Sequence, residues 1–271
     1  RMPLTVATWN INSVRLRFSQ IERFCLEHQP DALCLQETKC IDDLFPLKEA
    51  KKLGYEHVAI HGQKSYNGVA ILSKLPFADV TRESFCGLED RRHISVRFSG
   101  EAGPAKGLLI HNFYIPAGGD IPDPDANPKF AHKLKFLDEL TQWSDGRKAK
   151  ERSIVVGDLN VAPYEHDVWS HKQLLDIVSH TPVETDKLKD AIAAGQWVDA
   201  LRKLKPEPEK LYSWWSYRAA DWKLSNKGRR LDHVWLSPAL GGSLAAGEII
   251  SPTRGWERPS DHVPVMATLE L

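Results

Sequence analysis

Short runs rich in β-branched and other apolar residues recur along the whole chain and constrain its fold more than any other feature. They lie at 4–9, 31–36, 57–60, 68–73, 93–98, 107–115, 153–157, 230–237 and 263–271. Helical periodicity fits 16–27, 47–53 with Gly54 as the stop, and 130–143. Helices alternate irregularly with strands, and two early strand pairs look like hairpins, so a purely parallel sheet is not expected. The pattern predicts an α/β fold of two packed β-sheets with helices outside.

The composition is that of one soluble domain. The chain has 271 residues, of which 42% are hydrophobic and 27% charged, and no break in composition divides it. We therefore expect a single domain over residues 2–271. No apolar run approaches the ~20 residues of a membrane span. The N-terminal PLTVATWN reads as a strand without a preceding basic region, so we expect no secretory signal.

The cysteines and the charged residues bear on the cellular compartment and on the kind of partner that the protein could bind. The four cysteines contain no CxxC pair, which favours a reduced, cytoplasmic protein over a zinc protein. The 36 basic and 36 acidic residues cancel. A nucleic-acid partner would therefore have to meet a local basic face.

The apolar run at 153–157 is followed directly by polar residues. Three β-branched residues lead into Gly157, Asp158 and Asn160 in the stretch IVVGDLNVAP. A strand this apolar is expected to be covered on both faces, and strand ends are where α/β folds place their chemistry. Taken alone, Asp158 and Asn160 are either turn-forming residues, as Asp and Asn often are, or working groups.

Other strand-like runs end in polar residues in the same way. Such residues occur in WNIN, LQETK, NFY, RRLDH and PSDH, and they include Asn10, Glu37, Tyr114, Asp232, Asp261 and His262. Each is ordinary by itself. Their convergence would be a costly accident, because unpaired buried carboxylates are strongly unfavourable. Carboxylates and amides without a cysteine ligand suit a hard cation such as Mg²⁺ or Mn²⁺.

Two stretches are predicted to be loops. The first, AGGDIPDPDANP at 117–128, is too rich in glycine and proline for a strand and is expected at the surface. The second, 205–230, contains SWWSYRAADWKLSNKGRR, where aromatic and basic residues interleave. It is either a solvated loop anchored by tryptophans or a surface that grips unstacked nucleic acid.

Six blocks resemble a known family. In order along the chain, WNIN, LQETK, NFYIPAG, GDLNVAP, RRLDHVWLS and PSDHVPV resemble the signature blocks of the exonuclease III family of abasic-site endonucleases, within the DNase I-like superfamily. The resemblance implies a four-layer α/β sandwich with the site in a cleft at one sheet edge. It also implies a metal-dependent DNA repair phosphodiesterase, monomeric and located in the bacterial cytosol or nucleoid. Its expected substrate is duplex DNA, incised 5′ to abasic sites or trimmed at 3′ ends.

The resemblance also implies a metal site. Glu37 would be the principal ligand of Mg²⁺, for which Mn²⁺ can substitute. Asn10 and Asn12 would lie nearby, and Asp261 would be an outer or alternative ligand.

Catalytic roles follow from the same resemblance. Asp158 would orient or deprotonate the attacking water, or assist the leaving group, and Asn160 would hold Asp158, the water or a phosphate oxygen in line. His262, oriented by Asp232, would donate a hydrogen bond to the phosphate as negative charge builds. Tyr114 would give its hydroxyl to the phosphate.

DNA contacts are expected from Trp214, Trp215, Arg92 and Arg229, with Arg92 equally open to being an ordinary surface arginine. Two positions depart from the family. Ala117 stands where relatives carry an amide that touches the phosphate. Arg229 stands where relatives often carry Trp or Leu in the wall of the abasic-sugar pocket; alternatively it points to solvent, and Trp215 or Leu231 forms that wall. The balance between abasic-site incision, exonuclease activity and 3′-end trimming does not follow from the sequence.

Two rival functions share these residues. A lipid or inositol phosphate phosphoesterase would use the same metal and His-Asp groups, but its membrane-facing apolar segment is missing. A DNA-binding or scaffold protein with a dead site would be expected to lack a catalytic residue, whereas none is substituted here.

Overall fold

The computed structural model describes residues 1–147 and 150–271. One sheet contains β1 (Pro3–Asn10), β2 (Ala32–Gln36), β3 (His57–His61), β4 (Val69–Ser73), β11 (Leu244–Ile249) and β12 (Val265–Glu270). The other contains β5 (Phe77–Thr81), β6 (His93–Phe98), β7 (Leu109–Tyr114), β8 (Ser153–Asp158), β9 (Val198–Asp199) and β10 (Asp232–Leu236). Their strand orders are β11-β12-β1-β2-β4-β3 and β5-β6-β7-β8-β10-β9. Each sheet has one parallel pair, β1–β2 or β7–β8, and is otherwise antiparallel.

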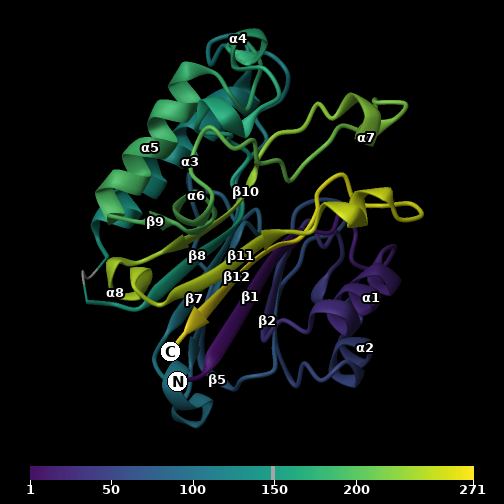
Figure 1. Cartoon of the computed structure of the whole chain (residues 1–271), viewed down its shortest axis with the longest axis vertical. Helices are drawn as coiled ribbons and strands as arrows, with labels where there is room; N and C mark the ends of the chain where they lie inside the picture. Colours follow the sequence, from purple (N-terminus) through teal and green to yellow (C-terminus); the bar gives the residue numbers. More distant parts are fainter. Residues whose placement is uncertain (148–149) are drawn as a thin grey trace.

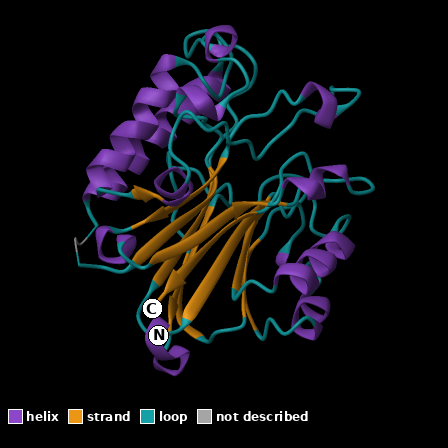
Figure 2. Ribbon diagram, viewed as in Figure 1, coloured by secondary structure: helices purple, strands orange, loops and turns teal. Residues whose placement is uncertain are grey.

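Helices cover the outer face of each sheet (Figures 1 and 2). The first sheet carries α1 (Phe18–His28) and α2 (Leu47–Lys52), and the second carries α3 (Pro128–Asp145) and α5 (Pro182–Gly195). Phe24 of α1 packs with Trp9, and Phe136 of α3 packs with Phe113. A third cluster, between the sheets, joins residues of both. The expected four-layer α/β sandwich of two mixed sheets is therefore confirmed.

The remaining helices are short. They are α4 (His171–Leu174), α6 (Ala200–Leu204), α7 (Trp222–Ser225) and α8 (Pro238–Gly241), with 3₁₀ turns at Asp42–Leu44, Gly100–Ala105, Glu165–Asp167 and Ser251–Gly255. The loop that carries α7 and the turn at Ser251–Gly255 project from the same end of the molecule (Figure 1). Among the described residues, no helix is both long and apolar enough to cross a membrane.

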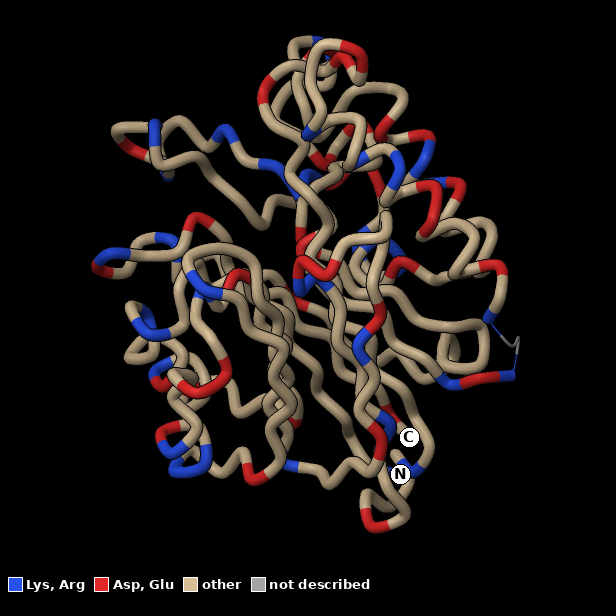
Figure 3. Tube along the Cα trace, turned by 180° about the vertical axis from the view of Figure 1, so that it is seen from behind, with Lys and Arg blue, Asp and Glu red and all other residues tan. Residues whose placement is uncertain are grey.

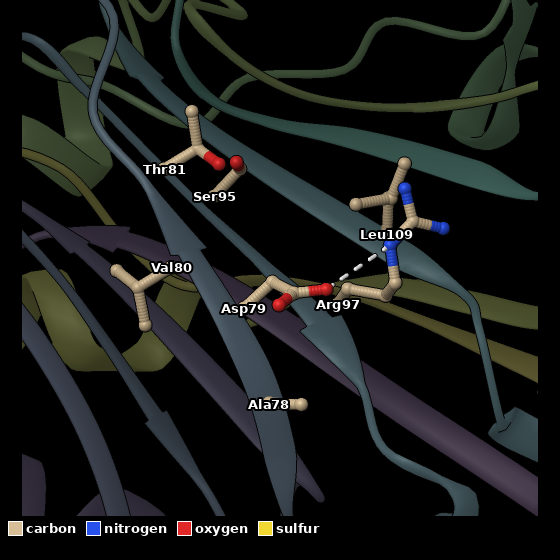
Figure 4. A pocket seen from close by; sticks show the side chains of 7 residues that line it. All are labelled: Ala78, Asp79, Val80, Thr81, Ser95, Arg97 and Leu109. Carbon is tan, nitrogen blue, oxygen red and sulfur yellow. Dashed lines mark ion pairs between the residues drawn. The ribbon is translucent and has the colours of Figure 1, made fainter.

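The sequence predicted the central strands and missed three at or near the edges, β5, β9 and β11. Four of the five residues of β5 are exposed, and β5 and β11 both show register irregularities, so neither has the apolar periodicity of a buried strand. Figure 4 shows a pocket lined by residues of β5, β6 and β7, where Asp79 of β5 pairs with Arg97 of β6. None of the polar strand ends lines that pocket.

Helix α5 was also missed, although its start carries a recognisable signal. Thr181 and Glu184 form a capping box, and Pro182 occupies the first turn.

Two buried amides fix the sheets to each other near the strand ends. Gln36 Nε2 donates to Asn112 Oδ1 (2.8 Å), and Asn112 Nδ2 donates to the carbonyl oxygens of Leu35 (3.0 Å) and Ala70 (2.9 Å). Both side chains are fully buried. Buried hydrogen bonds of this kind specify one arrangement of the two sheets, and so position the residues that follow.

Candidate active site

Three strands of the second sheet bring polar side chains to the same level. Tyr114 at the end of β7 pairs in register with Asp158 at the end of β8, and Asp158 pairs with Asp232 at the start of β10. Gly157 has a φ of 146°, and a Cβ there would lie 1.9 Å from the carbonyl oxygen of Phe113. Only glycine allows this approach, which explains the glycine before Asp158 in the sequence.

The first sheet contributes Asn10 and Glu37. Asn10 ends β1, and its Nδ2 donates to Glu37 Oε1 (3.1 Å) and Asp158 Oδ2 (2.9 Å). Glu37 follows β2 and also accepts from the Tyr114 hydroxyl, while Lys39 Nζ lies 3.3 Å from its Oε2. Burial alone would raise the pKa of Glu37, but the tyrosine, the lysine and the asparagine hold it below its ordinary value. Glu37 is therefore an ionised carboxylate at neutral pH.

His262 lies between two buried carboxylates. Its Nδ1 donates to Asp232 Oδ2 (2.8 Å), and its Nε2 lies 3.4 Å from Asp158 Oδ2. Burial alone would lower the pKa of His262, but Asp232 and Asp158 raise it well above its ordinary value. Burial raises the pKa of Asp158 to about 7, against the effect of His262. We assign the shared proton to the imidazole, because Asp232 stabilises its charged form from the other side.

Asn160 holds Asp158 through its backbone. Its N–H donates to Asp158 Oδ1 (3.1 Å), in a residue with a φ of 54°. Its side-chain Nδ2 donates to the carbonyl oxygen of Ile115 (2.7 Å). The amide therefore joins the loops after β7 and β8, which makes Asn160 both a turn-forming residue and part of the site.

A cavity of about 730 Å³ lies beside these groups. Its lining includes six residues named from the sequence as catalytic or metal-binding: Glu37, Tyr114, Asp158, Asn160, Asp261 and His262. Other parts of the wall come from Ala117, Gly119, Ile177, Val178, Trp214, Arg229 and Leu231. The strand ends that looked ordinary one by one thus meet around a single cavity.

Arg229 forms part of the cavity wall, so the alternative that it points to solvent is wrong. Its Nη1 donates to Val178 O (3.2 Å) and Ser179 Oγ (3.0 Å), and its guanidinium carbon lies 4.9 Å from the ring centre of Trp214. Leu231 also lines the cavity. The wall is therefore mixed, with a cation beside apolar side chains.

The structure separates the two tryptophans that were expected to contact DNA. Trp214 lines the cavity and donates from Nε1 to Asp261 Oδ2 (3.0 Å). Trp215 is buried, donates to Asn226 Oδ1 (3.0 Å) and packs edge-on against Trp222. Trp215 therefore anchors the loop, the alternative interpretation of this segment, and does not line the cavity.

Two other expected contacts also lie outside the cavity lining. Arg92 stacks 5.1 Å from the ring centre of Tyr114 and donates to its carbonyl oxygen (3.3 Å), so it supports the tyrosine. Asn12 Oδ1 accepts a hydrogen bond from Lys39 Nζ (2.6 Å). The side-chain oxygen that was expected near the metal is therefore bonded to an ammonium group.

Sequence reasoning missed Lys39 and Ser213 as supporting residues. Lys39 is the final residue of the LQETK block, two positions after Glu37. Ser213 Oγ donates to Asp232 Oδ2 (2.7 Å) and accepts the N–H groups of Leu231 and Asp232. The one signal for Ser213 in the sequence is that it directly precedes the two tryptophans of SWWSYR.

Two donor sets near the cavity have the chemistry of metal ligands. Asp158, Asp232 and His262 offer ligand atoms within 4.8 Å of one another, but a protonated imidazole has no lone pair to give. Glu37 and Asp261 offer carboxylate oxygens, and the Glu37 carboxylate is ionised without a metal. Asn10 turns its Nδ2 toward Glu37, and its Oδ1 accepts the N–H of Asn12. This second set fits a hard cation.

A further cluster, Glu83, His93 and His111, lies away from the cavity lining. The backbone N–H of Glu83 donates to His93 Nδ1 (3.0 Å), which places the His93 proton on Nε2, opposite His111 Nδ1 (3.1 Å). His93 therefore has no free nitrogen for a metal, and the cluster is a hydrogen-bond network of two buried histidines and the partly exposed Glu83.

Comparison with known proteins agrees with this site. The sequence matches the endonuclease/exonuclease/phosphatase family over residues 7–262. The chain belongs to this family. It is 33% identical over 269 residues to exodeoxyribonuclease III of Haemophilus influenzae, covering 96% of this chain and 97% of that protein.

Solved structures of the same fold include two with related chemistry. An AP endonuclease from Archaeoglobus fulgidus superposes with a TM-score of 0.89 and 31% identity, covering 99% of this chain and 100% of that one. The 3′-5′ exonuclease NExo from Neisseria meningitidis gives a TM-score of 0.88 and 31% identity, with the same coverage.

Proposed function

We propose that this protein hydrolyses phosphodiester bonds of damaged duplex DNA, as a metal-dependent repair nuclease of the exodeoxyribonuclease III type. The observation that carries the proposal is the meeting of Glu37, Tyr114, Asp158 and His262 around one cavity, with His262 hydrogen-bonded to Asp232. The exonuclease and AP endonuclease relatives support it.

The proposed reaction is attack of water on phosphorus with cleavage of the bond to the 3′ oxygen. Asp158, ionised while its neighbour His262 holds the proton, accepts a proton from the attacking water. The imidazolium donates a hydrogen bond to the phosphoryl oxygen that gains negative charge. The departing 3′ oxygen takes up a proton from solvent water, and Asp158 releases its proton to solvent, so one water is consumed for each bond broken.

Tyr114 serves as a neutral donor in this proposal. Burial, followed by the charges of Glu37 and Asp158, raises its pKa well above the ordinary value. The phenol therefore keeps its proton at neutral pH and can donate it to a phosphate oxygen in place of Glu37 Oε1, which accepts it in this structure.

We propose Mg²⁺, with Mn²⁺ as a substitute, as the cation held by Glu37 with Asn10 and Asp261. When bound, it supplies positive charge that neutralises the phosphate. Oxygen donors without a sulfur or neutral imidazole ligand support this choice.

We propose that the DNA meets the face around the cavity mouth. The segment 216–229 carries Arg218, Lys223, Lys227 and Arg229 against a single acid, Asp221. Figure 3 shows Lys and Arg along the projecting loops at this end. Local positive charge of this kind attracts the phosphate backbone in a protein whose net charge is zero. We propose a monomer in the bacterial cytosol or nucleoid, as in the sequence-based expectation.

The test is cleavage of end-labelled duplexes, one intact and one with a single abasic-site analogue, with Mg²⁺ and with excess chelator. Incision 5′ to the analogue, or stepwise 3′ shortening, is expected with Mg²⁺ only. Tight binding of either duplex without cleavage in any divalent metal would instead support a DNA-binding protein with a dead site.

A further inference from the structure

Lys133 is a fully buried lysine to which the proposed chemistry gives no role. It lies on α3, and its Nζ donates to Glu184 Oε1 (2.5 Å), Asn160 O (2.7 Å) and Ala117 O (3.2 Å). Ala117 lies in the loop after β7, and Asn160 in the loop after β8. One ammonium group therefore joins the two loops that follow Tyr114 and Asp158.

Glu184 extends the same network to a third segment of the cavity wall. Its carboxylate, also fully buried, accepts the N–H groups of Ser179 (2.9 Å) and Thr181 (3.1 Å) and the Thr181 hydroxyl (2.7 Å). Ser179 in turn accepts from Arg229. The pair thus contacts three residues that line the cavity, Ala117, Asn160 and Ser179.

The sequence leaves room for the lysine side chain. A Cβ at Gly118 would lie 2.8 Å from Lys133 Cδ, and Gly118 has a φ of +92°. A side chain at this position would therefore strain the backbone and push against the lysine stem at the same time. Gly118, the first glycine of AGGD, therefore makes room for the Lys133 side chain.

Stability alone does not explain this pair. Burying two charges costs desolvation free energy, and well-packed neutral replacements are often as stable. A surface ion pair, Asp138–Lys187 (2.6 Å), joins the same two helices without touching the site. The contact between α3 and α5 therefore has another ionic link.

We propose that Lys133 and Glu184 are positioning residues for phosphodiester cleavage, which hold the loops of Ala117, Asn160 and Ser179 in the arrangement that aligns Asp158 with its substrate. Misplacing a catalytic group by about 1 Å can cost about 10²-fold in rate. Binding of the duplex, which also uses the surrounding loops, depends less on this alignment.

The test is the double variant Lys133→Met/Glu184→Gln, which removes both charges while the glutamine oxygen can still accept from Ser179 and Thr181. With the duplex substrate and Mg²⁺, we expect kcat to fall by about 10- to 100-fold while KM stays within about threefold. The matched control, Asp138→Asn/Lys187→Gln, removes the surface pair between the same helices and should leave both constants unchanged. A folded double variant with kcat within about twofold of the parent would overturn the proposal.

Hydrogen exchange gives a readout that needs no activity. Amides in 158–162 and 177–181 should exchange faster in the Lys133/Glu184 variant, whereas those of β1 and β12 should not. Lost turnover with unchanged exchange in both segments would also contradict a positioning role.

Gly118→Ala tests the same link without removing a charge, and remains informative if the double variant does not fold. It should reproduce the loss of kcat and the faster exchange in 158–162. Combined with Lys133→Met, it should cost less than the sum of the single losses, because both act through one side chain. Near-parental kcat in Gly118→Ala, or additive losses, would show that the lysine stem does not transmit the effect.

Discussion

At the scale of single residues, three carboxylates of similar chemistry acquire different tasks from their partners. Glu37 receives hydrogen bonds from a phenol and an amide and lies beside an ammonium, which keep it ionised. Burial, with the charge of Asp232 adding to it, raises the pKa of Asp158 to about 7 against the opposing effect of His262. Asp232 accepts from His262 and Ser213 and does not line the cavity. In the proposed mechanism, these differences suit Glu37 to metal binding, Asp158 to proton transfer and Asp232 to orienting His262.

Glu37→Ala should raise the Mg²⁺ concentration needed for half-maximal cleavage by at least about tenfold. The reason is loss of the ionised carboxylate that we propose as the principal metal ligand. A magnesium titration of initial rates measures the shift. Undiminished cleavage by the parent protein in excess chelator would contradict the role of Glu37 as a metal ligand.

Asp158→Asn and His262→Ala should each lower turnover by about 10³-fold or more, while duplex affinity stays within a few-fold. Their interactions strengthen only as the transition state forms. The double variant should lose less than the sum of the two, because one proton is shared between them. Single-turnover rates and binding isotherms measure both quantities, and near-parental turnover of either single variant would refute its role.

Arg229→Trp should raise the ratio of abasic-site incision to 3′ exonuclease activity by about three- to tenfold. A tryptophan would give the cavity a drier wall for a sugar without a base, whereas arginine offers charge with little shape selection. Both activities should be measured at two salt concentrations. An unchanged ratio with an unchanged salt slope would mean that Arg229 neither selects the sugar nor contacts the backbone.

At the scale of elements, the loop between α6 and β10 depends on tryptophans that face its interior. Trp215 packs against Trp222, and its carbonyl oxygen accepts from Arg254. These contacts hold α7 out beside the cavity mouth, where the basic residues of the segment lie. The loop has little regular structure, so side-chain anchoring replaces backbone ladders.

Trp215→Ala should therefore weaken duplex binding by about tenfold or more and make 216–228 the first site of proteolytic cleavage. The DNA contacts would be lost through disorder, since Trp215 itself is buried. Limited proteolysis and binding isotherms measure the two effects. As a control, Leu224→Ala alters a side chain at the loop tip that is 84% exposed and should leave the cleavage pattern unchanged.

At the scale of the whole molecule, several buried histidines link stability to pH. Burial lowers the pKa of His93 to about 3 and that of His233 to about 4, with neighbouring arginines adding to the effect. His111 is also held well below its ordinary value, chiefly by burial. These side chains bind protons near pH ~6.5 when the chain unfolds and remain neutral in the fold.

The free energy of unfolding should therefore fall as the pH falls below ~6.5, by about 1.4 kcal/mol per pH unit for each such histidine until the folded pKa is reached. The sign follows because the unfolded state binds more protons in this window. Urea unfolding between about pH 7.5 and about pH 5.5 measures the slope.

His233→Gln is the matched variant, because a glutamine can still donate to Val161 O, which His233 Nε2 contacts at 2.8 Å. It should reduce the slope by about 1.4 kcal/mol per pH unit. The same slope in parent and variant would mean that His233 is already charged in the fold.

The sequence by itself determined the central strands, the mixed α/β class and most of the polar residues that meet around the cavity. Apolar periodicity in the sequence indicates directly which strands are buried. Carboxylates at the ends of buried strands cost free energy, so their presence indicates a functional role. It did not determine β5, β9 and β11, because partly exposed strands at or near the edges of a sheet lack that periodicity. Nor could it show that Trp215 faces inward, that Arg92 supports Tyr114, or that Lys39 occupies the oxygen of Asn12.

Those outcomes depend on which residues of distant segments lie within a few ångströms of one another, and only the packing of the two sheets and their helices sets these distances. The pairing of Tyr114, Asp158 and Asp232 at one level comes from strand register. The link from α3 to the loops after β7 and β8 comes from one buried lysine, which the sequence presents only as part of an amphipathic helix. Its partner Glu184 extends the link to Ser179. Local pattern fixes what each residue can do, and tertiary contact decides what it does.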